Sequence, residues 1–297
     1  MLLSKTIDFF IDSLYAARKS EQTIDNYKFN LKLFLKYTGD LRLYEVQNTH
    51  IRAFQKSRSH LKAWTVHQSY RVIRRFFNWC VIEGFLESAP MQNVEAPSLG
   101  KRVISVYTHE EIQKLLSVCN EKRFIGARNK AMISVLVDTG IREGELVGLD
   151  MSKVAFHSGI MKVIGKGDKE RVVKVGDKTR KALMKYLFLR EDQILNVENP
   201  KHNNKVFLSE EGRPLTEKGA LTIISRLGRV AGIPHVYIHK FRHTCAVEFL
   251  RAGGDLRTLQ IMLGHEDIAT TSVYLTAMNA DDVIRSHLKF SPGDRFL

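Results

Sequence analysis

A break rich in proline, serine and glycine interrupts the helical patterns of this chain about one third of the way along it. The stretch APSLGKRV, residues 96–103, follows Gly84 and Pro90, and the helical pattern resumes only after it. Glycine and proline clusters of this kind mark loops rather than regular elements. A chain of 297 residues is long enough for two domains that each bury a core. We therefore predict a first domain over residues 1–95, a linker over 96–106 and a second domain over 107–297.

Helical periodicity, with no convincing strand, characterises the first domain. In TVHQSYRVIRRFFNWCVIEGF, residues 65–85, apolar side chains recur at intervals of three and four positions. This spacing predicts a helix with one buried face, and it leaves Arg71, Arg74 and Arg75 on the other faces. The first domain is therefore predicted to be all-α.

Positive charge is concentrated in the same region. The chain has a formal net charge of +14, and no acidic residue lies between Val46 and Ile82. A solvated face normally mixes both signs, whereas a one-sided segment repels itself unless an anionic partner lies nearby. We therefore predict that this segment contacts a DNA backbone. The lysines and arginines predicted to bind DNA are Arg52, Lys56, Arg58, Lys62, Arg71, Arg74 and Arg75.

The second domain combines helices with one β-hairpin. Thr108 and Glu111 have the spacing of a capping box, and the helical pattern RNKAMISVLVDTG ends at Gly140. The stretch MKVIGKGDKERVVKV, residues 161–175, then predicts two strands around a turn, with Lys166 near its tip. The fold class is thus mainly α with two domains, the second α-rich with a small antiparallel β-sheet.

The motif HKFRH, residues 239–243, fits either a metal or a phosphate. On a helix its two histidines lie one turn apart, which suits zinc, but Arg242 between them would repel a cation. A zinc hydrolase motif H-E-x-x-H would place glutamate where Lys240 stands. We therefore favour phosphate, expect no metal or other cofactor, and interpret His243 as a structural histidine.

Three other segments carry groups suited to an anionic oxygen, although each alone is a weak signal. TGIREGEL holds Arg142 with Glu145 three positions on, a spacing that usually gives only a surface ion pair. Lys166 lies in a turn, where lysines are mostly solvated. LGHEDIATTSVY holds His265 and Tyr274, and a tyrosine on a helix is more often part of a core.

In their combination and order these residues resemble the signature of the tyrosine recombinases, the phage integrase and Xer family. TGIREGELVGL, VIGKGDKERVV, HKFRHTCAVEFLRAGGDLRTLQIMLGH and IATTSVY all look like the corresponding family stretches. The first domain is likewise similar to the family's SAM-like core-binding domain. The resemblance implies a site-specific recombinase that cleaves and rejoins DNA through a 3′-phosphotyrosyl intermediate. It implies the catalytic residues Tyr274, Arg142, Lys166, His239, Arg242 and His265, with Glu145 orienting Arg142.

The chemistry explains this choice of residue types. Two arginines can each offer paired donors to the non-bridging oxygens of an attacked phosphodiester, and Arg142 and Arg242 take this role. The expelled 5′ oxygen needs a proton, which the resemblance assigns to Lys166. Of the two histidines, His239 is the more suitable base toward the tyrosine hydroxyl, with His265 binding the phosphate.

The resemblance also implies partners. These are double-stranded DNA and a tetramer, formed by copies of this chain or with a second recombinase. The C-terminal segment after Asn279, with apolar Val283, Ile284 and Leu288, is expected to dock on a neighbouring protomer; packing on its own domain is the alternative.

Three other functions stay open: a type IB topoisomerase, a DNA-binding regulator that has lost activity, and a metal-dependent nuclease. Cys80, Cys119 and Cys245 form no CxxC motif, which favours a reducing compartment. The longest apolar run is far shorter than the roughly 20 residues of a membrane span. We therefore expect a cytoplasmic protein, and the family resemblance implies a prokaryotic one associated with the nucleoid.

Overall fold

The computed structural model describes residues 1–297 except 101–103, 166–167, 196–203, 292–293 and 295–297. Its internal contacts divide the chain into two compact units, Met1–Arg102 and Val103–Leu297. The division falls inside the APSLGKRV stretch. No helix among the described residues is long and apolar enough to cross a membrane.

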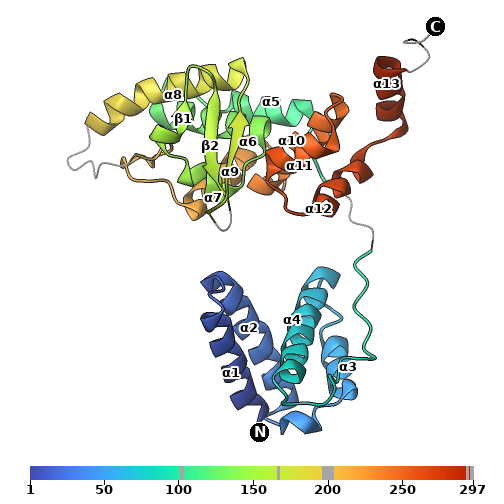
Figure 1. Cartoon of the computed structure of the whole chain (residues 1–297). Coiled ribbons are helices and arrows are strands. Elements are labelled where there is room, and N and C mark those ends of the chain that lie inside the picture. Colours follow the sequence, from blue (N-terminus) through green and yellow to red (C-terminus); the bar gives the residue numbers. More distant parts are fainter. Residues whose placement is uncertain (101–103, 166–167, 196–203, 292–293, 295–297) are drawn as a thin grey trace. The chain divides into compact units, whose positions relative to one another are not determined.

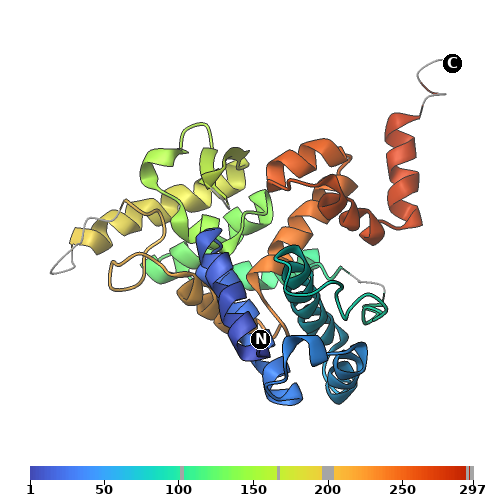
Figure 2. The same cartoon turned by 60° about the horizontal axis from the view of Figure 1, so that its bottom comes forward.

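The first unit is built from helices (Figures 1 and 2). They are α1 (Leu3–Ala16), α2 (Glu21–Thr38), the 3-10 turn η1 (Leu43–Glu45), α3 (Asn48–Ser57) and α4 (Ala63–Ile82). The predicted helix over α4 is confirmed: its apolar face, including Val66, Ile73 and Phe77, is buried. Aromatic side chains fill the core, where Phe10 of α1 meets Phe76 edge to face at 5.5 Å.

The second unit begins with helices and continues with a sheet. Its first helices are α5 (His109–Ser117), α6 (Phe124–Thr139) and α7 (Glu143–Gly148). The predicted capping box at Thr108 is confirmed, because its hydroxyl accepts from the Glu111 N–H and the Glu111 carboxylate accepts from the Thr108 N–H. Gly140 ends α6 in the left-handed conformation (φ 61°), which a residue with a Cβ atom rarely adopts.

The sheet of this unit is small and antiparallel, as predicted. Its strands β1 (Val154–Ala155), β2 (Ile160–Ile164) and β3 (Glu170–Lys174) lie in this order, and β2 pairs with β3 in the register Ile164↔Glu170. Met161, Val163 and Val173 alternate toward the core, so one face of the hairpin is buried.

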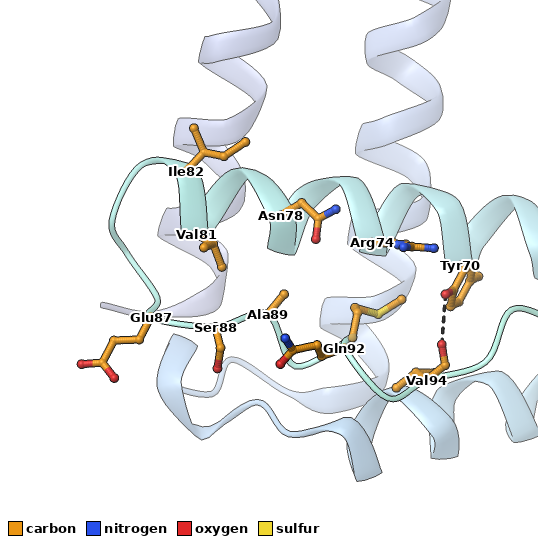
Figure 3. A pocket seen from close by; sticks show the side chains of 11 residues that line it. Tyr70, Arg74, Asn78, Val81, Ile82, Glu87, Ser88, Ala89, Gln92 and Val94 are labelled. Atoms are coloured by element: carbon orange, nitrogen blue, oxygen red, sulfur yellow. Dashed lines mark hydrogen bonds between the residues drawn. The ribbon is translucent and has the colours of Figure 1, made fainter.

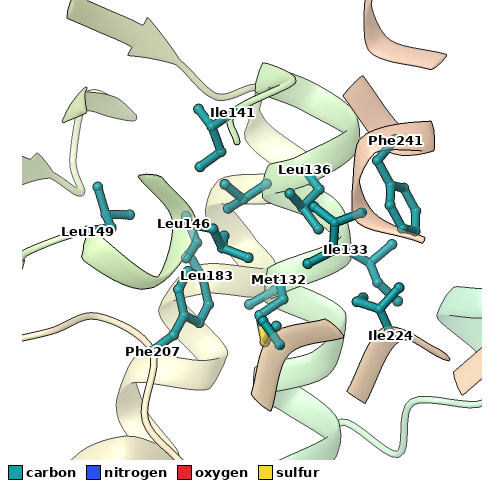
Figure 4. Close-up of a cluster of buried hydrophobic side chains, with 14 of the residues drawn as sticks. Met132, Ile133, Leu136, Ile141, Leu146, Leu149, Leu183, Phe207, Ile224 and Phe241 are labelled. Carbon is teal, nitrogen blue, oxygen red and sulfur yellow. The ribbon is translucent and has the colours of Figure 1, made fainter. Parts of the chain in front are cut away.

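Helices complete the second unit. They are α8 (Asp177–Leu195), α9 (Glu217–Val230), α10 (Ile238–Arg251), α11 (Leu256–Leu263), α12 (Ile268–Ser272), the 3-10 turn η4 (Val273–Ala277) and α13 (Ala280–Phe290), with η2 (Met151–Lys153) before β1. In the core, Figure 4 shows Ile133 and Leu136 of α6 near Ile224 of α9 and Phe241 of α10. A second cluster joins α10, α11 and η4 and includes Tyr274.

The C-terminal helix α13 lies at the rim of this unit beside the end of α10 (Figures 1 and 2). Asn279 caps it, and Asp282 in its first turn accepts from Arg251 of α10 at 3.3 Å. Val283, Ile284 and Leu288 remain exposed in the single chain. The polar side of α13 therefore attaches it to its own unit, whereas its apolar side is uncovered.

Candidate active site

Arg142 begins the site at the turn between α6 and α7. Its backbone N–H donates to the Glu145 carboxylate at 2.7 Å, and its guanidinium donates to the same carboxylate at 3.0 Å. The capping arrangement at the start of α7 therefore fixes both the backbone and the side chain of Arg142. The predicted pairing of Arg142 with Glu145 is present, and Glu145 is buried.

Arg171 of β3 completes this arrangement, and sequence reasoning missed it. It donates two hydrogen bonds to Glu145, at 2.5 and 2.7 Å, and a third to the backbone oxygen of Met262 at 2.8 Å. Burial favours the protonated acid, but the hydrogen bonds from Arg171 and from the Arg142 backbone outweigh it and lower the pKa of Glu145. Glu145 is thus an anion held by cations from two elements.

Arg242 projects from α10 and is only 1% exposed. Its guanidinium donates to the backbone oxygens of Gly140 and Leu263, each at 2.7 Å, and to Nε2 of His265 at 2.8 Å. Burial, together with the nearby charge of Arg142, lowers the pKa of Arg242 to about 10. The group therefore stays charged at neutral pH, in a fixed orientation and close to a second guanidinium.

His265 follows the left-handed Gly264 that ends α11. Because an arginine only donates, Nε2 of His265 must be an acceptor toward Arg242, so Nδ1 carries the proton and donates to the Thr271 hydroxyl at 2.8 Å. Burial and then the charges of Arg242 and Arg142 lower the pKa of His265 to about 4. The ring is consequently neutral at physiological pH.

Tyr274 is buried in η4, with 4% of its surface exposed. Its ring stacks near that of His265, with centroids 6.3 Å apart, and its hydroxyl lies 3.2 Å from Nδ1 of His243. His239 packs edge to face against His243 at 4.6 Å. Arg142, Arg242, His239, His265 and Tyr274 thus belong to one connected cluster of the second unit.

His243, interpreted from the sequence as a structural histidine, is buried in α10, and its contact with Tyr274 was not foreseen. Its spacing from His239 places both rings on the same side of α10, and η4 packs against that helix. The i, i+4 spacing of the two histidines, which suggested zinc, therefore marks the side of α10 that faces η4.

A cavity of about 690 Å³ lies beside this cluster. It is lined by polar and charged groups of the α6–α7 turn, of the hairpin and of the segment after α11, among them Arg142, Lys169, Arg171, His265 and Glu266. Lys169 also forms an ion pair with Glu266, which joins the hairpin to the segment that carries His265. The predicted Lys166 lies outside the described residues.

The basic residues predicted to bind DNA lie in the first unit and differ in their surroundings. Arg52 donates to the backbone oxygen of Asn93 at 2.8 Å, and the half-buried Arg58 covers the Phe54 ring at 5.3 Å. The exposed residues of this set are Arg52, Lys56, Lys62, Arg71, Arg74 and Arg75. Figure 3 shows Arg74 at the edge of a groove between α4 and the segment that ends at Val94.

Comparison with known proteins assigns the chain to a family. The model of the phage integrase family matches residues 105–280, and that of the phage integrase N-terminal SAM-like domain matches residues 7–84. The chain belongs to the phage integrase family.

Named members of the phage integrase family align with nearly the whole chain. The tyrosine recombinase XerD of Listeria monocytogenes serotype 4b is 32% identical over 95% of this chain and 98% of its own length. The tyrosine recombinase XerC of Oceanobacillus iheyensis is 31% identical over 96% of this chain and 95% of its own. The predicted enzyme class, a tyrosine-type site-specific recombinase, is confirmed.

Solved structures agree with this fold. A Tn1549 transposon integrase in complex with transposon right end DNA superimposes with a TM-score of 0.79, at 16% identity over 98% of this chain and 100% of that one. A lambda integrase tetramer bound to a Holliday junction gives 0.75, at 17% identity over 92% of this chain and 77% of that one. The predicted fold class is confirmed. The family model and the named recombinases give no support to a topoisomerase or an inactive regulator.

Proposed function

We propose that this recombinase breaks and rejoins DNA strands through Tyr274, at a phosphate bound by Arg142, Arg242 and His265. The observation that carries the proposal is the 2.8 Å contact between Arg242 and His265 with the Tyr274 ring stacked beside it. A nucleophile and preorganised phosphate-binding donors then belong to the same site of one chain.

The reaction follows from these groups. The Tyr274 oxygen attacks phosphorus and loses its proton, the bond from phosphorus to the 5′ oxygen breaks, and a 3′-phosphotyrosyl link forms. Charge grows on the non-bridging oxygens, where the Arg142 and Arg242 guanidinium groups stabilise it. The 5′ oxygen takes a proton from Lys166, a role that rests on the family resemblance. Attack by the 5′ hydroxyl of another strand reverses these steps and exchanges partners.

The two units divide this work. We infer that residues 1–95 form a DNA-binding domain, that 96–106 are a linker and that 107–297 are the catalytic domain. Arg71 and Arg75 on the exposed side of α4 can follow a phosphate backbone, which contributes affinity without sequence specificity.

The partner is double-stranded DNA that carries paired recombination half-sites, and the active assembly is a tetramer of this chain or one shared with a second recombinase. The exposed Val283, Ile284 and Leu288 of α13 support this, because an apolar stripe of this kind needs a partner surface. We infer that the protein acts in the bacterial cytoplasm, on nucleoid DNA, and the bacterial origin of its relatives supports this.

Trapping on a nicked half-site tests the chemistry. Wild-type protein is expected to form a covalent adduct with the 3′ end of the DNA, also in excess chelator, while Tyr274→Phe binds the same DNA and forms none. Adduct formation by Tyr274→Phe would contradict the proposal. Lys166→Ala is expected to be slow on ordinary DNA and to recover on DNA with sulfur at the 5′-bridging position, since thiolate leaves without a proton.

Truncation after Ala280 tests the assembly. The shortened chain is expected to bind single sites and to nick half-sites, but to lose strand exchange between two full duplexes. Exchange at the wild-type rate would contradict docking through α13, and a full-length protein that only relaxes supercoils would favour the topoisomerase.

A further inference from the structure

The hydroxyl of Tyr274 is in contact with a side chain to which the proposed function gives no role. It lies 3.2 Å from Nδ1 of His243, a hydrogen-bonding distance for a phenol and an imidazole. Both side chains are buried, with exposures of 4% and 8%. Bulk water is therefore a poor acceptor for the phenol proton here, and an imidazole nitrogen lies close to it.

His265 cannot take this proton in the arrangement observed. Its Nε2 lone pair accepts from Arg242, and its Nδ1 donates to Thr271. Both ring nitrogens of His265 are therefore already in hydrogen bonds. His265 is left to bind and orient the phosphate rather than to accept the proton of Tyr274. His243 lies on the same helix as Arg242, so the positions of the proton acceptor and of a phosphate-binding group are set by one rigid element.

We propose that His243 is a further catalytic residue, which holds the Tyr274 hydroxyl and accepts its proton during DNA cleavage. This inference rests on the proposed function of Tyr274 as nucleophile. The O–H bond of Tyr274 breaks and its proton passes to the Nδ1 lone pair of His243, while the oxygen forms its bond to phosphorus. When the strands are rejoined, the phenolate leaves phosphorus and takes the proton back from the imidazolium.

The chain offers a matched control for this role. His239 is the histidine one turn earlier on α10, and the family resemblance makes it the alternative base. Asparagine at position 243 places an oxygen near the former Nδ1, so it can accept a hydrogen bond but cannot carry the proton away. His243→Asn therefore separates positioning of the hydroxyl from proton acceptance, and His239→Asn is the comparison variant.

The experiment measures single-turnover adduct formation on a nicked half-site, with either tyrosine or a fluorinated tyrosine of lower phenol pKa at position 274. His243→Asn is expected to slow the reaction roughly a hundredfold or more. Fluorination is expected to shrink this deficit by roughly tenfold or more, because a more acidic phenol depends less on a base. The deficit of His239→Asn is expected to stay unchanged. His243→Gln serves as a second variant if His243→Asn does not fold, as judged by thermal unfolding and DNA binding.

Several results would overturn the inference. A His243→Asn rate close to wild type, or a deficit that fluorination leaves unchanged, would reduce His243 to a packing role. A deficit that shrinks for His239→Asn instead would assign the base to His239. If the wild-type chain forms no adduct at all, the proposed function itself fails, and this inference fails with it.

Discussion

The arginines on α4 of the first unit and Arg242 of the second unit are held in opposite ways. On α4, Arg71, Arg74 and Arg75 are exposed, in a stretch of sequence without acidic residues. In the second unit, Arg242 is buried and donates to two backbone oxygens and to His265. An exposed guanidinium can adjust to any phosphate along a duplex, whereas a buried and fixed one can serve only a phosphate that arrives at a defined position. The difference separates binding from chemistry, since only preorganised donors stabilise charge that appears in the transition state.

Substitution of the buried arginine is expected to have the largest effect. Arg242→Lys keeps the positive charge but loses the planar set of donors, so the rate of half-site cleavage is expected to fall on the order of a hundredfold. Affinity for duplex DNA is expected to change little. Single-turnover cleavage and a binding titration on the same DNA check this. A loss of affinity equal to the loss of rate would mean that Arg242 acts in DNA binding and not in the chemical step.

Removal of the exposed arginines is expected to have the opposite pattern. Arg71→Gln, Arg74→Gln and Arg75→Gln together are expected to weaken DNA binding. The slope of log affinity against log salt is expected to flatten by about 0.9 for each phosphate that an arginine no longer neutralises. Cleavage at saturating DNA is expected to stay near wild type.

A control with the same change in charge sharpens this test. Lys178→Gln, Lys181→Gln and Lys185→Gln remove three exposed charges from α8 of the other unit. An equal change of slope in both triple variants would mean that net charge matters and that the location on α4 does not.

Substitution of Arg171 tests whether residues that only contact Glu145 are needed to keep Arg142 in position. Arg171→Gln removes the ion pair with Glu145, so Arg142 is expected to lose alignment and cleavage to slow roughly tenfold. Arg171→Lys is expected to recover part of the rate, because it restores a cation next to Glu145. Cleavage rates of the two variants at saturating DNA measure this, and equal rates would indicate that charge at this position is irrelevant.

The last expected effect is on stability rather than on the rate of cleavage. The pKa of His265 is about 4 in the folded chain and near 6.5 for an ordinary histidine, so the unfolded chain binds a proton first as the pH falls. The stabilisation of the folded chain by the neutral His265 ring is therefore complete above about pH 6.5, and it is lost progressively as the pH falls toward 4. His265→Gln is expected to flatten the pH dependence of the unfolding free energy in this window, measured by urea titration. An unchanged dependence would mean that the site does not keep this ring neutral.

Local patterns predicted the parts of this site that depend on near neighbours. Arg142 and Glu145 are three residues apart, and Gly140 and Gly264 end helices at positions visible in the sequence. Interactions between distant segments could not be predicted this way. The pairing of Arg171 with Glu145 depends on the hairpin register, and the approach of His243 to Tyr274 depends on how η4 packs against α10. The recombinase resemblance predicted Tyr274, the two arginines and the two histidines as catalytic, but it did not point to Arg171 or to the contact of His243 with Tyr274.

The most direct test of the central claim is to identify the residue that becomes joined to DNA. Wild-type protein is incubated with a nicked half-site, the adduct is digested with protease and nuclease, and the modified peptide is sequenced by mass spectrometry. We expect a nucleotide linked through its 3′-phosphate to Tyr274. Attachment to any other residue, or cleavage that releases a free 3′-phosphate without an adduct, would contradict it.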